Sequence, residues 1–297
     1  MERLFFLDTD IGPDCDDMAA LAILLSLCKE GKGRLLGVTH CTGSPYGLAA
    51  IDCVQKRFGM QLPLGTFCDK SFLTGEKYIS YTPFLHDHFP HDYPAGSPQP
   101  DGAEIFAAAL KDAPPKSVTL ITIGPLNQLA HFLSHPAAGK MMQEKVDRIV
   151  LMGGDFEKES PHAEWNILMD IPAARNALSL WKGAMDFCPF EAFSAVLTGE
   201  CLKNSPNHPV SAAYRIYTKG KMLRPSWDLG TVAAALLGAQ APYAWSKRGR
   251  VDIDEKGYTY FTPDPEGTHR YLRLTGDPHQ AETQLEALLN SALERSR

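Results

Sequence analysis

The 297-residue sequence lacks the features that mark several classes of protein. It has no run of lysine and arginine, no Cys-x-x-Cys pair, no internal repeat and no apolar run of the roughly 18 residues that a membrane helix needs. Its 29 Lys+Arg against 35 Asp+Glu give a formal net charge of −6. Because nucleic acids and anionic membranes attract basic surfaces, we expect neither a nucleic acid nor a membrane as a partner.

Cysteine usage and the start of the chain indicate the compartment. The seven cysteines are an odd number without metal-ligand spacing, which excludes a zinc ribbon and disfavours a disulfide framework. The first apolar residues run directly into Asp8, with no hydrophobic core of a signal peptide. We therefore predict reduced thiols and a cytoplasmic protein.

Apolar segments with strand-like and helix-like periodicity alternate along the first two thirds of the sequence. The strand-like segments are Leu4–Leu7, Leu35–Thr39, Leu62–Phe67, Val118–Ile123, Arg148–Met152 and Met185–Cys188. The helix-like segments are Asp17–Cys28, Leu48–Phe58, Ala103–Leu110, Leu126–Leu133 and Pro172–Trp181. This alternation predicts an α/β fold with an open, mainly parallel sheet flanked by helices. Since no linker-like stretch interrupts it, we expect a single domain over residues 1–297.

The last third of the sequence is more helical. Helices are predicted over Ala212–Tyr217, Thr231–Leu237 and Glu282–Arg295. A small β-ribbon is predicted to pair Val251–Ile253 with Thr259–Phe261. The segment Thr74–Gly102 has no periodicity and exceeds the usual loop length, so it is predicted to be a lid or substrate loop.

Five carboxylates lie within residues 8–17, where the first predicted strand passes into a helix. Ligands bind at the carboxyl ends of parallel strands. Like charges about 6 Å apart repel by roughly 3 kcal/mol per pair at an effective dielectric constant near 20, so the cluster favours protonation, hydration or a bound cation. Oxygen ligands without histidine or cysteine favour Ca²⁺ or Mg²⁺. An EF-hand is excluded, because Gly12 is fifth and Ala19 twelfth counting from Asp8.

Two enzyme families begin with such an Asp-x-Asp motif. Phosphohydrolases of the haloacid dehalogenase type continue with Thr or Val where this chain has Gly12, and they remain an alternative with Asp8 as nucleophile and Mg²⁺ as cofactor. The sequence more closely resembles the inosine-uridine preferring nucleoside hydrolase family, in five segments that follow the family's order. They are Asp8-Thr9-Asp10-x-Gly12 with Asp16-Asp17, Gly37-Val38-Thr39 through Gly43, Gly124-Pro125-Leu126, Met152-Gly153-Gly154 with Ala163-Glu164-Trp165-Asn166 and Asp170-x-Pro172-x-Ala174, and Trp227-Asp228.

The resemblance implies Ca²⁺-dependent hydrolysis of the N-glycosidic bond of a purine or other ribonucleoside, or a related N-riboside, giving free base and ribose for salvage. It implies that calcium is held by Asp10, Asp17, Asp228 and the carbonyl of Ile123, and that Asp10 deprotonates the attacking water. It also implies a homodimer or homotetramer. The substrate contacts that it implies come from Asp16, Ser44, Glu164, Trp165, Asn166 and Trp227.

The sequence departs from the family pattern near its site. Two extra residues after Gly12 leave open whether Asp14 or Asp16 contacts the sugar. Trp227 replaces the histidine with which many members protonate the leaving base. The candidate proton donors are therefore histidines elsewhere, namely His40, His86, His88, His91 and His162. A nucleoside-binding protein with weak or no turnover is a further alternative.

Overall fold

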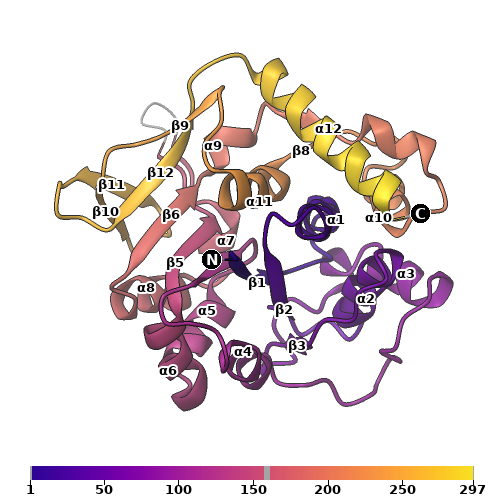
Figure 1. Cartoon of the computed structure of the whole chain (residues 1–297), viewed down its shortest axis with the longest axis horizontal. Helices are drawn as coiled ribbons and strands as arrows, with labels where there is room; N and C mark the ends of the chain where they lie inside the picture. Colours follow the sequence, from indigo (N-terminus) through magenta and orange to yellow (C-terminus); the bar gives the residue numbers. More distant parts are fainter. Residues whose placement is uncertain (1, 157–160, 297) are drawn as a thin grey trace.

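A ten-stranded sheet runs through the computed structural model, which describes residues 2–156 and 161–296 (Figure 1). The strand order is β11-β10-β12-β6-β5-β4-β1-β2-β3, and β9 pairs with β12 beside this path. The strands joined in parallel are β1 Leu4–Thr9, β2 Arg34–His40, β3 Leu64–Thr66, β4 Val118–Thr122, β5 Val146–Met152, β6 Ala184–Cys188 and β12 His269–Leu274. The strands joined in antiparallel fashion are β9 Tyr243–Trp245, β10 Gly249–Ile253 and β11 Thr259–Pro263. The predicted mainly parallel α/β fold is confirmed.

Helices cover both faces of the sheet, which is why every residue of β1 and β4 is buried. The α-helices are α1 Asp16–Lys29, α2 Gly47–Arg57, α3 Thr82–His88, α4 Gly102–Leu110, α5 Asn127–Ser134, α6 Pro136–Lys145, α7 Trp165–Leu168, α8 Ile171–Leu180, α9 Phe190–Phe193, α10 Pro209–Tyr217, α11 Trp227–Leu237 and α12 Pro278–Arg295. Two 3₁₀ helices, η1 Glu76–Tyr78 and η2 Glu200–Asn204, and a two-stranded ribbon of β7 Leu197–Thr198 and β8 Arg224–Pro225 complete the described elements. No helix of the described chain is long and apolar enough to cross a membrane.

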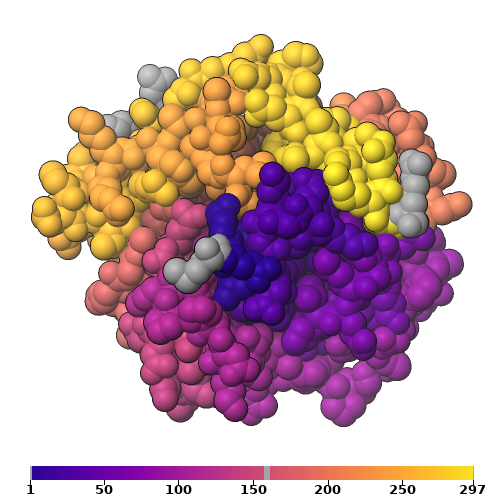
Figure 2. Space-filling model, viewed as in Figure 1, coloured from indigo at the N-terminus to yellow at the C-terminus, as the bar shows by residue number. Residues whose placement is uncertain are grey.

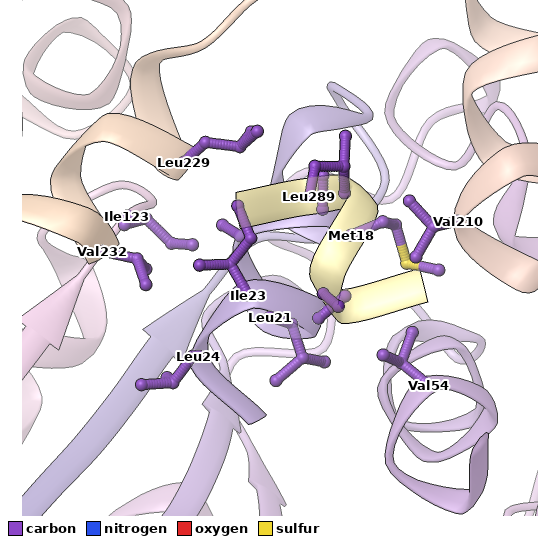
Figure 3. Close-up of a cluster of buried hydrophobic side chains, with 14 of the residues drawn as sticks. Met18, Leu21, Ile23, Leu24, Val54, Ile123, Val210, Leu229, Val232 and Leu289 are labelled. Atoms are coloured by element: carbon purple, nitrogen blue, oxygen red, sulfur yellow. The ribbon is translucent and has the colours of Figure 1, made fainter. Parts of the chain in front are cut away.

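Helix α1 lies at the centre of one hydrophobic core. All of its residues from Asp16 to Leu27 are buried, because it packs against α2, α10, α11 and α12 as well as the sheet. Figure 3 shows side chains of α1 such as Leu21 and Ile23 surrounded by those of its neighbours, including Val232 of α11 and Leu289 of α12. Figure 2 shows the yellow C-terminal segment lying against the indigo N-terminal segment. This packing holds the first turn of α1, with its two aspartates, inside the protein.

The predicted β-ribbon is confirmed, because Val251–Ile253 of β10 pairs with Thr259–Phe261 of β11, and β10 also pairs with β12 and thereby joins the ribbon to the main sheet. Two other parts of the chain differ from what the sequence predicts. The segment predicted as an irregular loop over Thr74–Gly102 contains η1 and α3, and Thr82 and Leu85 of α3 are buried at helical spacing. Helix α6 was not predicted, because Ala138 and Met142 are its only buried residues and give a weak apolar pattern.

Candidate active site

A cavity of about 460 Å³ opens at the carboxyl edge of β1, β4 and β5. Asp10 and Ile123, which directly follow β1 and β4, and Met152, the last residue of β5, contribute to its wall. The other residues lining it are Pro13, Asp14, Asp16, Asp17, Lys77, Tyr78, Glu164, Trp165, Asn166, Met169, Phe190, Tyr217, Arg224, Trp227 and Asp228. The fold therefore brings most of the residues predicted for the site to one place.

Carboxylates from distant parts of the chain meet in this cavity. Asp16, Asp17 and Asp228 each place an oxygen within 4.8 Å of the others, and none of the three is more than 5% exposed. The backbone N–H of Asp228 donates to Asp16 Oδ2 at 3.0 Å, which ties the start of α11 to the start of α1. Thr9 Oγ1 donates to Asp17 Oδ1 at 2.5 Å. Asp16, predicted as a sugar contact, thus lies together with the predicted metal ligands Asp17 and Asp228.

Burial makes it unfavourable for these carboxyl groups to ionise together. Desolvation raises the pKa of Asp17 to about 7. Desolvation, reinforced by neighbouring carboxylates, raises the pKa values of Asp10, Asp16 and Asp228 well above their usual range. A buried set of oxygen donors without an equal number of cations fits a hard divalent ion such as Ca²⁺ or Mg²⁺.

Asp14 has a different partner from the other acids of the motif. Arg224 Nε donates to Asp14 Oδ1 at 2.9 Å and to Oδ2 at 3.0 Å, and Arg224 Nη2 also donates to Oδ2. The guanidinium carbon lies 5.0 Å from the ring centre of Trp227 and 5.3 Å from that of Tyr217. Arg224 and Tyr217 were not predicted for the site. Because 210 positions separate Arg224 from Asp14, no local pattern in the sequence links them.

Glu164 and Asn166 line the cavity from the start of α7. Glu164 caps this short helix, since Oε1 accepts from the N–H of Asn166 at 2.9 Å and Oε2 from that of Ile167 at 3.3 Å. Oε2 also accepts from the N–H of Gly154 at 3.1 Å. Burial raises the pKa of Glu164 to about 7. Asn166 Nδ2 donates to the carbonyl of Met152 at 3.2 Å. The backbone thus fixes both polar side chains in the cavity wall.

Aromatic rings form another part of the wall. Phe190 and Trp227 stack with ring centres 5.2 Å apart and an interplanar angle of 26°. Trp227 Nε1 donates to the carbonyl of Phe190 at 3.0 Å, which fixes the indole. Trp165 also lines the cavity. Both tryptophans predicted to stack on a base are therefore cavity residues.

Ser44 and His40 are predicted site residues that the fold places elsewhere. Neither is among the described residues that line the cavity. Ser44 is buried, and its Oγ accepts from the N–H of Tyr46 at 3.3 Å. His40 Nε2 lies 2.9 Å from the carbonyl of Ile11, and burial lowers the pKa of His40 to about 4. These contacts give both side chains partners in the fold.

The other four candidate histidines also lie outside the described cavity wall. His86, His88 and His91 have their ring nitrogens bonded within the α3 segment and the residues that follow it. His162 lies nearer, because its ring meets the edge of Phe190 with centres 4.3 Å apart. Its Nδ1 is 2.5 Å from Asp155 Oδ2.

Asp8, the nucleophile of the phosphohydrolase alternative, has hydrogen-bond partners in the two strands beside its own. It is buried and is not among the described cavity residues. Its Oδ1 accepts from Thr39 Oγ1 at 2.6 Å and its Oδ2 from Thr122 at 3.4 Å. Burial raises the pKa of Asp8 to about 8. A carboxyl group held between two neighbouring strands in this way is poorly suited to attack a phosphate.

Comparisons with known proteins agree with the geometry. Residues 5–283 match the family described as inosine-uridine preferring nucleoside hydrolase. The chain is 42% identical over 84 residues to the pyrimidine-specific ribonucleoside hydrolase RihA of Photobacterium profundum, an alignment that covers 27% of this chain and 26% of the relative. The chain thus spans about a quarter of the length of that curated relative.

Solved structures of low sequence identity share the fold. The inosine-uridine preferring nucleoside hydrolase of Bacillus anthracis has a TM-score of 0.71 at 18% identity, over 98% of this chain and 100% of that one. The purine-preferring ribonucleoside hydrolase of Gardnerella vaginalis has a TM-score of 0.74 at 16% identity, over 99% of each chain. The type III effector XopQ, complexed with adenosine diphosphate ribose, has a TM-score of 0.74 at 18% identity, over 99% of this chain and 95% of that one.

Proposed function

This chain belongs to the inosine-uridine preferring nucleoside hydrolase family, and we propose that it is a calcium-dependent N-ribosyl hydrolase. Its substrate is a ribonucleoside or related N-riboside, and its products are ribose and the free base. The observation that carries the proposal is the meeting of buried carboxylates from positions 16, 17 and 228 in a cavity with an aromatic wall. The carboxylates suit an ion and a sugar, whereas the rings suit a planar base.

Calcium would be held by Asp10, Asp17, Asp228 and the carbonyl of Ile123, with Asp16 beside them. When bound, the ion supplies the positive charge that keeps these carboxylates ionised and makes a bound water more acidic. The donor set supports this because it consists of buried oxygens. No histidine or cysteine is among the described residues that line the cavity, so the set favours a hard ion over zinc.

The side chains of this chain then orient the sugar and activate the water that attacks it. A carboxylate oxygen of Asp10 accepts the proton of the attacking water. Asp16, Glu164 and Asn166 hold ribose hydroxyl groups, because all three line the cavity and carry side-chain oxygens that accept hydrogen bonds. Trp227 and Trp165 stack on the base. As the bond to the base breaks, the ribosyl group acquires oxocarbenium character, which the surrounding carboxylates stabilise.

The test is release of free base from a panel of nucleosides, followed by chromatography, in protein stripped with a chelator and reloaded with calcium. The panel includes inosine, adenosine, guanosine, uridine and cytidine, together with ADP-ribose because XopQ was solved with that ligand. Asp10→Asn should lower kcat/KM by at least about 10³-fold. The exposed Asp252→Asn is the matched control and should keep full activity. Equal activity of Asp10→Asn and wild type would contradict the assigned base.

Two outcomes separate hydrolysis from the binding alternative. Free base and ribose in equal amounts support the hydrolase. Thermal stabilisation by a nucleoside without product, even after long incubation, supports a nucleoside-binding protein with weak or no turnover. We further propose a role in nucleoside salvage and a homodimer or homotetramer, and sedimentation at working concentration measures the latter.

A further inference from the structure

One wall of the cavity combines aromatic rings with a cation. Trp227 directly precedes Asp228, so this wall adjoins the carboxylate cluster. Phe190 stacks on Trp227, and the Arg224 guanidinium lies over Trp227 and near Tyr217. A planar base that meets this wall while its sugar faces the carboxylates therefore lies close to a guanidinium.

Arg224 is held in a way that leaves part of its guanidinium available. Asp14 accepts from Nε and Nη2, whereas Nη1 has no hydrogen-bond partner among the described residues. The side chain lines the cavity and is 28% exposed, so a ligand can reach it. The other cation of the described wall, Lys77, lies with its ammonium 4.6 Å from the ring centre of Tyr78.

Cleavage of an N-glycosidic bond requires a group that stabilises the departing base. When the bond between C1′ and nitrogen breaks, its electron pair stays on the base, which must receive a proton or meet a positive charge. None of the chain's ten histidines is among the described residues that line the cavity. A guanidinium stays charged at all physiological pH values and so does not act as a proton donor, but it donates strong hydrogen bonds to an anion.

We propose that Arg224 is the leaving-group residue of this enzyme, an inference that rests on the proposed function. Its Nη1 donates to the departing base and stabilises the negative charge that develops there, while Asp14 positions the guanidinium. The C1′–N bond breaks with its electron pair remaining on the base, and the water oxygen bonds to C1′. The water proton passes to Asp10, and the base takes a proton from solvent after release.

The test compares two leaving groups. One substrate is the best nucleoside of the panel, and the other is p-nitrophenyl β-D-ribofuranoside, whose phenolate leaves without assistance. Arg224→Gln should lower kcat/KM on the nucleoside by roughly 100-fold, as loss of a charge-stabilising donor does, and should change it little on the phenyl riboside. Arg224→Lys keeps the charge without the fork geometry, so it should fall between wild type and Arg224→Gln. Asp14→Asn should cause a smaller loss that is also confined to the nucleoside.

A control and two further outcomes make the result decisive. Arg250→Gln removes a comparable Arg–Asp pair, with Asp264 at 2.6 Å, at an exposed site and should change neither rate. Equal losses on both substrates in Arg224→Gln, or a lost calcium-induced rise in Tm, would overturn the proposal, because they indicate a role in assembling the site. A selective loss on the nucleoside in His162→Ala but not in Arg224→Gln would overturn it in favour of a proton donor. Wild-type protein that cleaves neither substrate would instead refute the proposed function and this inference with it.

Discussion

The two ends of helix α11 lie in regions that differ in whether buried charged groups have a partner of opposite charge or polarity. At its end, Arg3 Nη2 donates to the carbonyl of Ala235 at 2.7 Å, Arg3 Nη1 donates to that of Leu236, and Arg148 Nη2 donates to Ala235 at 3.2 Å. Cations at a helix C-terminus stabilise it. At its start, Asp228 instead joins a cluster of other acids.

The comparison extends to the acids themselves. Asp186, near the end of α11, is 2% exposed and accepts from Arg270 Nε at 2.6 Å and from Arg148 Nη1 at 3.4 Å. In the cavity, by contrast, Arg224 is hydrogen-bonded to Asp14, and neither Asp16 nor Asp17 has a cationic ion-pair partner among the described residues. Buried charge is therefore matched where it holds the fold together and left unmatched where an ion is expected.

The largest effect predicted from this comparison is at the carboxylate cluster, where a substitution should greatly lower activity without lowering stability. Asp17→Asn should reduce kcat/KM by at least about 10³-fold, because it removes a proposed ligand. It should leave the Tm of the calcium-free protein unchanged or higher, because it removes a like charge from the cluster. Steady-state kinetics and thermal denaturation test this, and a large fall in the calcium-free Tm would break the comparison.

The converse result is expected at Asp186. Asp186→Ala leaves Arg148 and Arg270 without their shared partner, so we expect a loss of about 3–5 kcal/mol in the free energy of unfolding. The kcat/KM of the molecules that remain folded should be close to that of wild type. Urea denaturation, with activity corrected for the folded fraction, is the measurement. A stable Asp186→Ala variant would show that the two regions do not differ as described.

Calcium should stabilise the protein by binding to the carboxylate cluster that contains Asp17 and Asp228. At a calcium concentration 100 times its Kd, the free energy of unfolding should rise by about 2.7 kcal/mol. Because the pKa of Asp17 is raised to about 7, the ion must displace protons below that pH, so the rise in Tm should be larger at pH 8 than at pH 5.5. Calcium titrations of wild type and Asp228→Asn measure it, and an equal rise in both would contradict the assigned ligands.

The smallest predicted effect concerns Glu191, a residue that belongs to neither region. Burial raises the pKa of Glu191 to about 8, and its Oε2 has no hydrogen-bond partner among the described residues. Because the folded-state pKa lies above the unfolded one, wild type loses stability as the pH rises from about 4.5 to about 8. Glu191→Gln should remove this loss and gain about 1–3 kcal/mol over wild type at pH 8.5, with little difference at pH 4.5. Denaturation at both pH values tests it, and a constant difference would show that Glu191 does not titrate as described.

The parts of the fold that could be predicted are those with a local pattern. Buried parallel strands are short apolar runs, so Leu4–Leu7 and Val118–Ile123 were predicted as strands, and they form β1 and β4. Strand β12 was not predicted, because its one buried residue, Leu272, lies between Tyr271 and Arg273 and gives no apolar run. The strand forms by pairing with β6, whose paired residues lie 84 positions earlier in the sequence. A pattern within a short stretch of sequence does not reveal such a distant pairing.

The same distinction holds for the site. The density of aspartates after β1 is visible within ten residues, and the resemblance added Asp228 and Trp227. The position of Arg224 in the site depends on its hydrogen bonds to Asp14, which lies 210 positions earlier in the chain. Ser44 and His40 stay predictions: both lie near a family motif, both have backbone groups as hydrogen-bond partners, and neither is among the described residues that line the cavity.

The hydrogen bond from Asp228 to Asp16 spans 212 positions and has a consequence for biosynthesis. A nascent chain that has emerged only as far as α10 contains the N-terminal aspartates but lacks the residue that completes their cluster. Ribosome-bound intermediates should therefore capture calcium poorly until α11 has docked beside α1. Metal uptake would then report that the C-terminal third has been synthesised and packed in place.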